Sequence, residues 1–201
     1  MAAARRITAK TRIFQLKVQL AGIRPPVWRR VLVPGEIDLG ELHDVIQTAF
    51  GWTNSHLHQF EIGTARYGSP DPDWGMDDLA DESRAQLFRL AAAGDRLNYT
   101  YDFGDDWVHH VTVEKVLEAE PGARYPTCSA GRRACPPEDV GGPWGYGDFL
   151  QALADPMHHE HEQWSEWIGG ATFDPNAFDL ASTDAALAAF AWRANPLRPV
   201  R

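Results

Sequence analysis

Apolar and polar side chains alternate along residues 14–20, which predicts a half-buried strand. After a turn at residues 22–26, the apolar stretch 27–33 predicts a second strand. Between residues 42 and 50 the spacing of apolar side chains changes from two residues to 3.6, which is typical of a helix that buries one face. The beginning of the chain therefore predicts a strand, a strand and a helix.

The predicted helix has a start signal and a stop signal. Asp38 can cap its N-terminus, and Glu41, three residues later, completes a capping-box pattern. Gly51 suits the left-handed position that follows a helix. Residues 56–62 then predict a third strand. This order predicts a β-grasp-like strand–strand–helix–strand unit at the N-terminus, in which one helix covers a mixed sheet.

The rest of the chain predicts a central hairpin and then helices. The runs 97–102 and 107–117 predict two antiparallel strands around a short turn. Residues 118–147 are rich in Pro and Gly, and we expect a long ordered loop there. Residues 148–195 predict a helical C-terminal part. The expected fold class is α+β, with a mixed or antiparallel sheet.

Composition and charge fit a single α+β domain over residues 12–195 behind a flexible basic tail, 1–11. Of the 201 residues 44% are hydrophobic, and no run approaches the roughly 18 apolar residues that a membrane span needs. The net charge of −9 argues against a general nucleic-acid binder, which is usually basic. We therefore expect a cytoplasmic monomer or homodimer whose partner is an unknown protein or small molecule, with nucleic acid the less favoured partner and no membrane contact.

His56 and His58 are the first candidates for a site. Two histidines at positions i and i+2 of a strand point to the same face and can share a metal ion. Alternatively, both are core histidines that hydrogen-bond to backbone carbonyls or to an aspartate. The pattern leaves both interpretations open.

The predicted hairpin adds further polar groups. Asp102, Asp105 and Asp106 bracket its turn, where a carboxylate can ligate a cation, act as a base or accept hydrogen bonds from turn N–H groups. The last role is the default for Asp105 or Asp106. His109 shares a strand face with Trp107, whereas His110 lies on the solvated face. A divalent metal, Zn or Mn, is a possible cofactor, although the sequence demands none. Its candidate ligands are His56, His58, Asp102, Asp105 and His109.

Glu138 and Asp139 are the candidate catalytic residues. They follow two prolines that stiffen the chain, so either carboxylate could serve as a general base. Alternatively, they anchor the loop to the sheet through Arg29 or Arg30.

The same loop contains the cysteines and two aromatic residues. Cys128 and Cys135 lack zinc-knuckle spacing, although two thiolates and two histidines would complete a tetrahedral zinc site. In a reducing compartment they are free thiols or metal ligands rather than a disulfide. Trp144 and Tyr146 could supply contact area in a groove between the loop and the hairpin. The candidate binding residues are Arg29, Arg30, Trp107, Trp144 and Tyr146.

Several enzyme motifs are missing from the sequence. The run 158–162 includes a His-Glu pair, but Ser165 stands where a zinc protease motif needs its second histidine. The sequence also has no phosphate-binding glycine loop, no Gly-x-Ser-x-Gly elbow and no dinucleotide fingerprint.

Five segments together resemble the plasmid pRiA ORF-three-like family. They are Gly22–Arg30, Leu42–His43, Gly51–Phe60, Tyr101–His109 and Tyr125–Tyr146. The resemblance covers roughly residues 12–192 and implies an α+β fold and a bacterial mobile-element context, with no established activity. In this family a further cysteine often follows the Pro-Pro-Glu-Asp stretch, but here that position is Val140, which weakens a cysteine-rich metal site.

Members of this family are often labelled as transposon passenger or TnpR resolvase proteins. A serine recombinase needs a nucleophilic serine on an early strand, nearby arginines and a basic helix-turn-helix. The first serine here is Ser55, and the C-terminal third is not basic. A tyrosine recombinase set is not found either, so the residues do not support the label.

Two main hypotheses follow, and the first is favoured. The protein is a non-enzymatic module that binds a ligand or partner near a His/Asp/Glu polar centre. Alternatively, it is a metal-dependent hydrolase or nuclease in which His56 and His58, with nearby carboxylates, hold the metal. A weaker third idea is a DNA-associated accessory factor of a mobile element.

Overall fold

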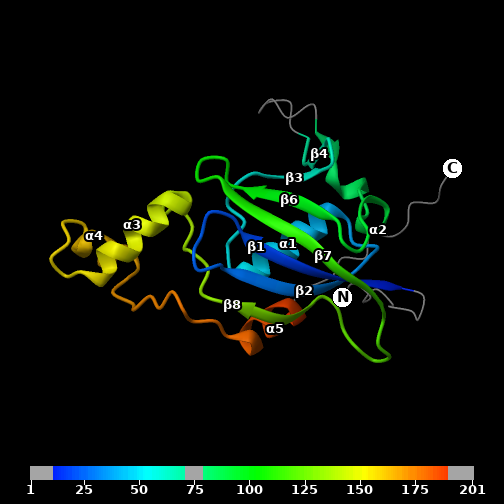
Figure 1. The fold of residues 1–201 in the computed structure, drawn as a ribbon. Helices are drawn as coiled ribbons and strands as arrows, with labels where there is room; N and C mark the ends of the chain where they lie inside the picture. Colours follow the sequence, from blue (N-terminus) through cyan, green and yellow to red (C-terminus); the bar gives the residue numbers. More distant parts are fainter. Residues whose placement is uncertain (1–10, 71–78, 190–201) are drawn as a thin grey trace.

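The strands predicted from alternation belong to a large sheet. The computed structural model describes residues 11–70 and 79–189, and over these residues it has eight strands in the order β5-β4-β3-β6-β7-β1-β2-β8 (Figure 1). Neighbouring strands are antiparallel except for the parallel pair β4–β5. The predicted α+β class and the mixed sheet are confirmed. The strands are β1 (Arg12–Leu20), β2 (Trp28–Pro34), β3 (His58–Ile62), β4 (Ala65–Gly68), β5 (Ala80–Asp81), β6 (Arg96–Tyr101), β7 (Trp107–Glu118) and β8 (Thr127–Arg132).

The helices follow the expected order with different limits. No helix among the described residues is long and apolar enough to cross a membrane. The predicted tail, 1–11, lies outside the described residues except for Thr11. The helices are α1 (Leu39–Phe50), α2 (Leu87–Leu90), α3 (Gly142–Ala154), α4 (His161–Trp167) and α5 (Leu180–Ala189), with a 3₁₀ turn η2 (Glu82–Arg84).

Helix α1 forms with the predicted caps. The Asp38 side chain accepts a hydrogen bond from the Glu41 N–H at 2.8 Å, and the Glu41 side chain accepts one from the Asp38 N–H at 3.1 Å. Gly51 ends the helix at φ 81°, a conformation that glycine adopts without steric cost. Both ends of the helix are therefore determined locally.

The β-grasp detail of the prediction is not confirmed. Strands β1 and β2 pair with each other, as expected. Strand β3, however, pairs with β4 and β6 rather than with β1 or β2. The hairpin β6–β7 thus separates β3 from the first two strands in the sheet.

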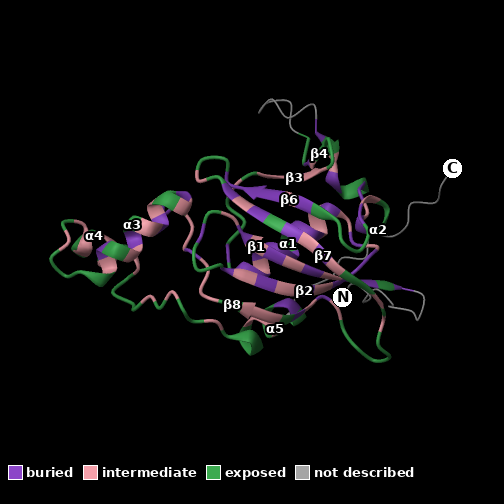
Figure 2. Cartoon of the chain, viewed as in Figure 1, coloured by how far each residue is buried: buried purple, intermediate pink, exposed green. Residues whose placement is uncertain are grey.

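One face of the central strands is covered and the other is open. Helix α1 lies behind the sheet in the view of Figure 1, and no helix of the described chain crosses the face turned to the viewer. The strands show the corresponding alternation of buried and more exposed positions in Figure 2. The core lies between the covered face and α1 and includes Leu16, Leu42, Ile46, Phe60 and Tyr99.

Residues 118–147 differ from the expected long loop. Part of this stretch, Thr127–Arg132, forms β8 along the outer side of β2. Helix α3 begins at Gly142, where a Cβ atom would lie 2.1 Å from the Asp105 carbonyl oxygen. Only glycine permits this approach, which places the start of α3 against the hairpin turn. Pairing with β2 and contact with the turn are long-range effects that local composition does not reveal.

Candidate functional site

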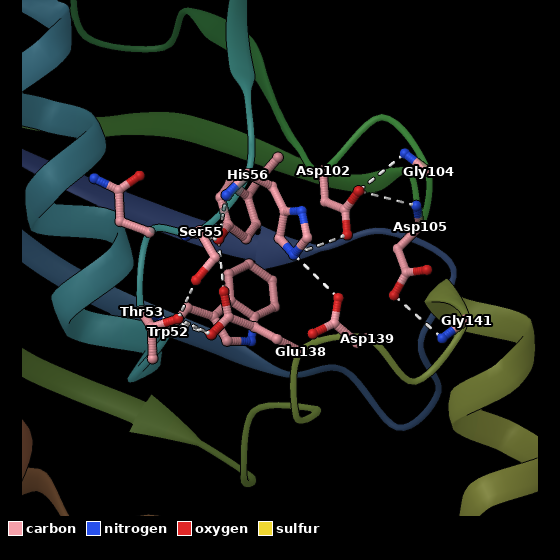
Figure 3. Close-up of polar contacts among 12 residues, drawn as sticks. Trp52, Thr53, Ser55, His56, Asp102, Gly104, Asp105, Glu138, Asp139 and Gly141 are labelled. Atoms are coloured by element: carbon pink, nitrogen blue, oxygen red, sulfur yellow. Dashed lines mark hydrogen bonds and ion pairs between the residues drawn. The ribbon is translucent and has the colours of Figure 1, made fainter.

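Three segments that are distant in the chain meet at one end of the covered face. His56 precedes β3, Asp102 follows β6 in the hairpin turn, and Asp139 lies in the loop before α3. His56 Nε2 is 3.0 Å from Asp139 Oδ1 and 3.6 Å from Asp102 Oδ2 (Figure 3). One ligand atom from each of the three residues lies within 4.8 Å of the other two. We call His56, Asp102 and Asp139 the triad.

Asp102 is held by its own turn. Its Oδ1 accepts hydrogen bonds from the backbone N–H groups of Gly104, at 2.9 Å, and Asp105, at 3.4 Å. One oxygen of Asp102 therefore has the turn role that was expected of Asp105 or Asp106, and its Oδ2 faces His56. The carboxylate is oriented before any ligand arrives.

Tyr101 connects the two loops that carry His56 and Asp139. Its buried hydroxyl donates to Glu138 Oε1 at 2.6 Å and accepts from the N–H groups of Ser55, at 2.8 Å, and His56, at 3.3 Å. Burial first, and then the hydrogen bond to Glu138, raises the pKa of Tyr101, so the hydroxyl keeps its proton. This hydroxyl aligns the segments on either side of the triad.

Both carboxylate oxygens of Glu138 accept hydrogen bonds in the same arrangement. Its Oε2 accepts from the Thr53 N–H at 2.8 Å and from the Thr53 hydroxyl at 2.7 Å. Burial acts to raise the pKa of Glu138, but the hydrogen bonds from Tyr101 and Thr53 outweigh it and the net pKa is lowered. Glu138 therefore anchors its loop, which was the alternative to a catalytic role. Its partners are Tyr101 and Thr53 rather than Arg29 or Arg30.

Two more hydrogen bonds fix the loops around the triad. The Trp52 indole N–H donates to the Pro136 carbonyl at 2.8 Å. Asp105 Oδ2 accepts from the Gly141 N–H at 3.1 Å (Figure 3), so Asp105 joins the hairpin turn to α3 and does not face His56.

His58 belongs to a different cluster from His56. Strand β3 begins at His58, so His56 lies outside the strand and the two-residue alternation does not apply to it. His58 Nε2 is 2.8 Å from Glu82 Oε2, and its ring stacks on that of His43 with centroids 3.5 Å apart. The two histidines predicted to share a metal are therefore directed to different partners.

A closed ring of hydrogen bonds holds His43, a residue that the sequence analysis did not select. The Gln47 amide donates to the Tyr99 hydroxyl at 2.8 Å, which lies 2.7 Å from His43 Nδ1. His43 Nε2 lies 2.8 Å from Asn54 Oδ1, and the Asn54 N–H donates to Gln47 Oε1 at 3.2 Å. Because an amide oxygen only accepts, His43 carries its proton on Nε2, and its Nδ1 accepts a hydrogen bond from the Tyr99 hydroxyl. Burial lowers the pKa of His43 to about 3.

A sequence signal for this ring was present. His43 and Gln47 are four residues apart on α1, so they lie on the same face of the helix as its buried apolar residues. Polar side chains on such a face need partners inside the protein.

A cavity of about 400 Å³ adjoins the triad and shares His56 with it. Its walls come from α1, the loop before β3, the end of β4 and η2. None of the described lining residues is Lys or Arg, and two are acidic. The lining residues are Gly40, His43, Asp44, Asn54, His56, Leu57, His58, Ser69 and Glu82.

The other predicted site residues are dispersed over the molecule. His109 and Trp107 are fully buried in the core. Arg29 is buried and donates to the carbonyls of Ala49, Trp28 and Arg132. Arg30 pairs with a glutamate on the opposite face of the sheet.

The two aromatic residues expected to line a groove are divided between surface and core. Trp144 is 90% exposed on α3, whereas Tyr146 is buried against Phe149. They do not form one binding surface.

The cysteines are free thiols. Burial raises the pKa of Cys128 and, more strongly, that of Cys135, so both stay protonated at neutral pH. Neither cysteine belongs to a group of candidate metal ligands among the described residues, and one imidazole and two carboxylates are the donor set of the triad.

A family model, a relative and a solved structure match most of this chain. A family model described as plasmid pRiA4b ORF-3-like protein matches residues 12–182. The uncharacterized protein y4hQ of Sinorhizobium fredii is 42% identical over 179 residues, which cover 87% of this chain and 90% of the relative. The crystal structure of a protein of unknown function from Methanosarcina mazei Go1 matches with a TM-score of 0.79 and 38% identity, over 85% of this chain and 97% of that one.

Proposed function

The chain belongs to the plasmid pRiA4b ORF-3-like family, and we propose that this member is a cation-dependent binding protein whose metal ligands are His56, Asp102 and Asp139. The convergence of one imidazole and two carboxylates from three separate loops carries the proposal. Such a donor set suits Mn²⁺ or Zn²⁺.

The immediate surroundings of the triad favour a cation. His56 Nε2 is a buried atom that has no well-aligned hydrogen bond within the described chain, although two carboxylates lie close to it. A buried polar atom without a partner is costly, and a cation between the imidazole and the carboxylates would remove that cost. The Asp139 side chain is 65% exposed, so coordination positions on its side would be open to solvent and to a ligand.

The adjoining cavity supports a binding role for the centre. His56 forms part of its wall, and a cation on Nε2 would place the imidazole proton on Nδ1 and fix the ring. The carboxylates of Asp44 and Glu82 also line the cavity. We therefore propose a small polar ligand with hydrogen-bond donors or positive charge.

The hydrolase alternative uses the same triad but lacks a free base. Glu138 accepts three hydrogen bonds, and these occupy both of its oxygens. Asp139, the other predicted catalytic carboxylate, is a member of the triad and would be a metal ligand. Binding is therefore the better-supported function of the centre.

The test is calorimetric titration of untagged, chelator-treated protein with Mn²⁺ and Zn²⁺. We expect one site per chain, and we expect Asp139→Asn and Asp102→Asn each to weaken it by about 100-fold through the loss of a protein ligand. Both positions have positive φ, 60° and 56°, which asparagine tolerates, so the backbone should not be disturbed.

Asp106→Asn is the matched control, because Asp106 is an exposed carboxylate in the same turn at φ 52°. It should bind the cation as the unmodified protein does. Failure of both metals to bind below about 1 mM, or unchanged binding in the two triad variants, would refute the proposal. Mn²⁺-dependent cleavage of bis(4-nitrophenyl) phosphate that Asp139→Asn abolishes would favour the hydrolase.

A further inference from the structure

The open face of the sheet has chemistry opposite to that of the triad. The register places Asn98, His110, Gln19, Trp28 and Arg132 side by side in one row across β6, β7, β1, β2 and β8. The next row contains Arg96, Thr112, Lys17 and Arg30. No described helix covers these rows in Figure 1, and Figure 2 shows their strands with exposed and half-buried positions.

A cavity of about 310 Å³ lies within these rows. Every residue lining it has a side chain that can donate a hydrogen bond, and none of the described lining residues is acidic. This is a local positive site in a chain whose net charge is −9. It is lined by Lys17, Gln19, Arg96, Asn98, His110 and Thr112.

Trp28 stands beside this cavity and is only half buried. It pairs with Gln19, a lining residue, and the Lys17 ammonium lies 5.4 Å from its ring centroid. The Arg30 guanidinium lies 5.3 Å from the same ring. A half-buried indole flanked by two cations therefore adjoins a pocket suited to an anion.

Glu114, an acid that contacts Arg30 on this face, is paired with that cation. Glu114 accepts two hydrogen bonds from Arg30, at 2.6 and 2.9 Å, and one from Gln15 at 2.8 Å. The hydrogen bond from Arg30, opposed in part by burial, lowers the pKa of Glu114 and keeps it charged beside its partner. Lys17 and Arg96 remain as the cations that line the cavity.

We infer that this open face binds single-stranded nucleic acid, with a phosphate in the cavity of Lys17 and Arg96 and a base stacked on Trp28. A half-buried aromatic ring next to cations on an open sheet matches an unpaired base and its backbone. A duplex keeps its bases stacked inside and would not use Trp28. The charge of the whole chain opposes tight binding, so we expect micromolar affinity at low salt.

The test is fluorescence anisotropy with a labelled twelve-nucleotide oligo-dT at 50 and 200 mM salt. The two cations of the cavity, Lys17 and Arg96, predict a slope of log K against log salt of about −1.4. Lys17→Glu/Arg96→Glu should weaken binding more than tenfold, and Trp28→Ala should weaken it by about five- to 100-fold through lost stacking. The charge-matched control is Arg84→Glu/Arg89→Glu, whose exposed arginines lie on η2 and α2, outside this face.

Circular dichroism checks that each variant is folded. If Trp28→Ala does not fold, the double variant Lys17→Glu/Arg96→Glu tests the inference by itself. Binding that is equal in the double variant and its control would overturn the inference. Equal competition by a duplex of the same length would do so as well. Oligonucleotide binding should persist in EDTA and in Asp139→Asn, so this result is separable from the proposed cation site.

Discussion

The two faces of the central sheet give adjacent residues of one strand opposite degrees of burial. On β7, His109 is fully buried against Phe50, Trp52 and Tyr99, and its neighbour His110 is exposed on the open face. The covered face leads to a cavity with two acids and to the triad, whereas the open face has a cavity with two bases. The sheet thus has an acidic cavity on its covered face and a basic cavity on its open face.

This contrast teaches that a net charge of −9 is a poor guide to any single surface. Alternation sends successive side chains of a strand to opposite faces, so acidic and basic groups can be sorted locally. Interactions between charges are screened beyond about 8–10 Å at physiological salt, and each cavity then acts mainly through its own lining.

The largest effect is expected where the covered face ends at the triad. Tyr101→Phe removes a hydroxyl that serves Glu138 and two backbone N–H groups. We expect the free energy of unfolding to fall by about 3 kcal/mol, because these groups lose a partner. Cation affinity should fall about tenfold as the loops loosen. Urea denaturation and calorimetry measure the two effects.

Tyr67→Phe is the control, a half-buried tyrosine of β4. It should change stability by less than about 0.5 kcal/mol. A Tyr101→Phe variant as stable as this control would show that the hydroxyl does not organise the triad.

An intermediate effect is expected from His109. Burial lowers the pKa of His109 to about 3, from an ordinary value of 6.5. Below pH 6.5 the unfolded chain therefore takes up a proton that the folded protein excludes, and stability falls as the pH falls. Between pH 7.5 and pH 5, His109 alone should lower the free energy of unfolding by about 2 kcal/mol.

The measurement is the free energy of unfolding at the two pH values. His109→Phe should reduce the difference between them by that amount. An equal pH dependence in His109→Phe and the unmodified protein would contradict the contrast between the two faces.

The smallest effect is expected on the open face. Glu114→Gln removes the acid that pairs with Arg30, a partly exposed ion pair whose side chains are 22% and 31% accessible. Stability should change by less than about 1 kcal/mol. Oligo-dT affinity should rise about threefold, because one negative charge leaves this face.

Glu118→Gln provides the comparison, since Glu118 pairs with Arg12 at the far end of the same strand. Its effect on oligo-dT affinity should be smaller than that of Glu114→Gln. Equal gains in both variants would mean that net charge, rather than the open face, governs the interaction.

Local patterns in the chain were sufficient for its main elements. Alternation along β1 and β7, and the capping residues Asp38, Glu41 and Gly51, determine strands and a helix through contacts within a few residues. The division of His109 and His110 between two faces also follows from alternation alone.

The site depended on contacts that no local pattern encodes. The sequence predicts His56 and Asp102 as metal ligands and Asp139 as a catalytic carboxylate. It pairs His56 with His58 because the predicted strand begins two residues before β3 does. Glu82, which pairs with His58, and the ring around His43 were not anticipated. Strand limits, loop approach and the pairing of β3 with β6 bring these groups together across the chain.

The sequence by itself determined the alternation of buried and exposed residues along β1 and β7 and the buried face of α1, since these depend on periodicity and on nearest neighbours. Only the tertiary structure decided which polar groups meet, because a hydrogen bond or a shared ligand requires atoms to approach within about 3 Å. That approach is set by the packing of the whole sheet with α1 and its loops, and by no short stretch of residues.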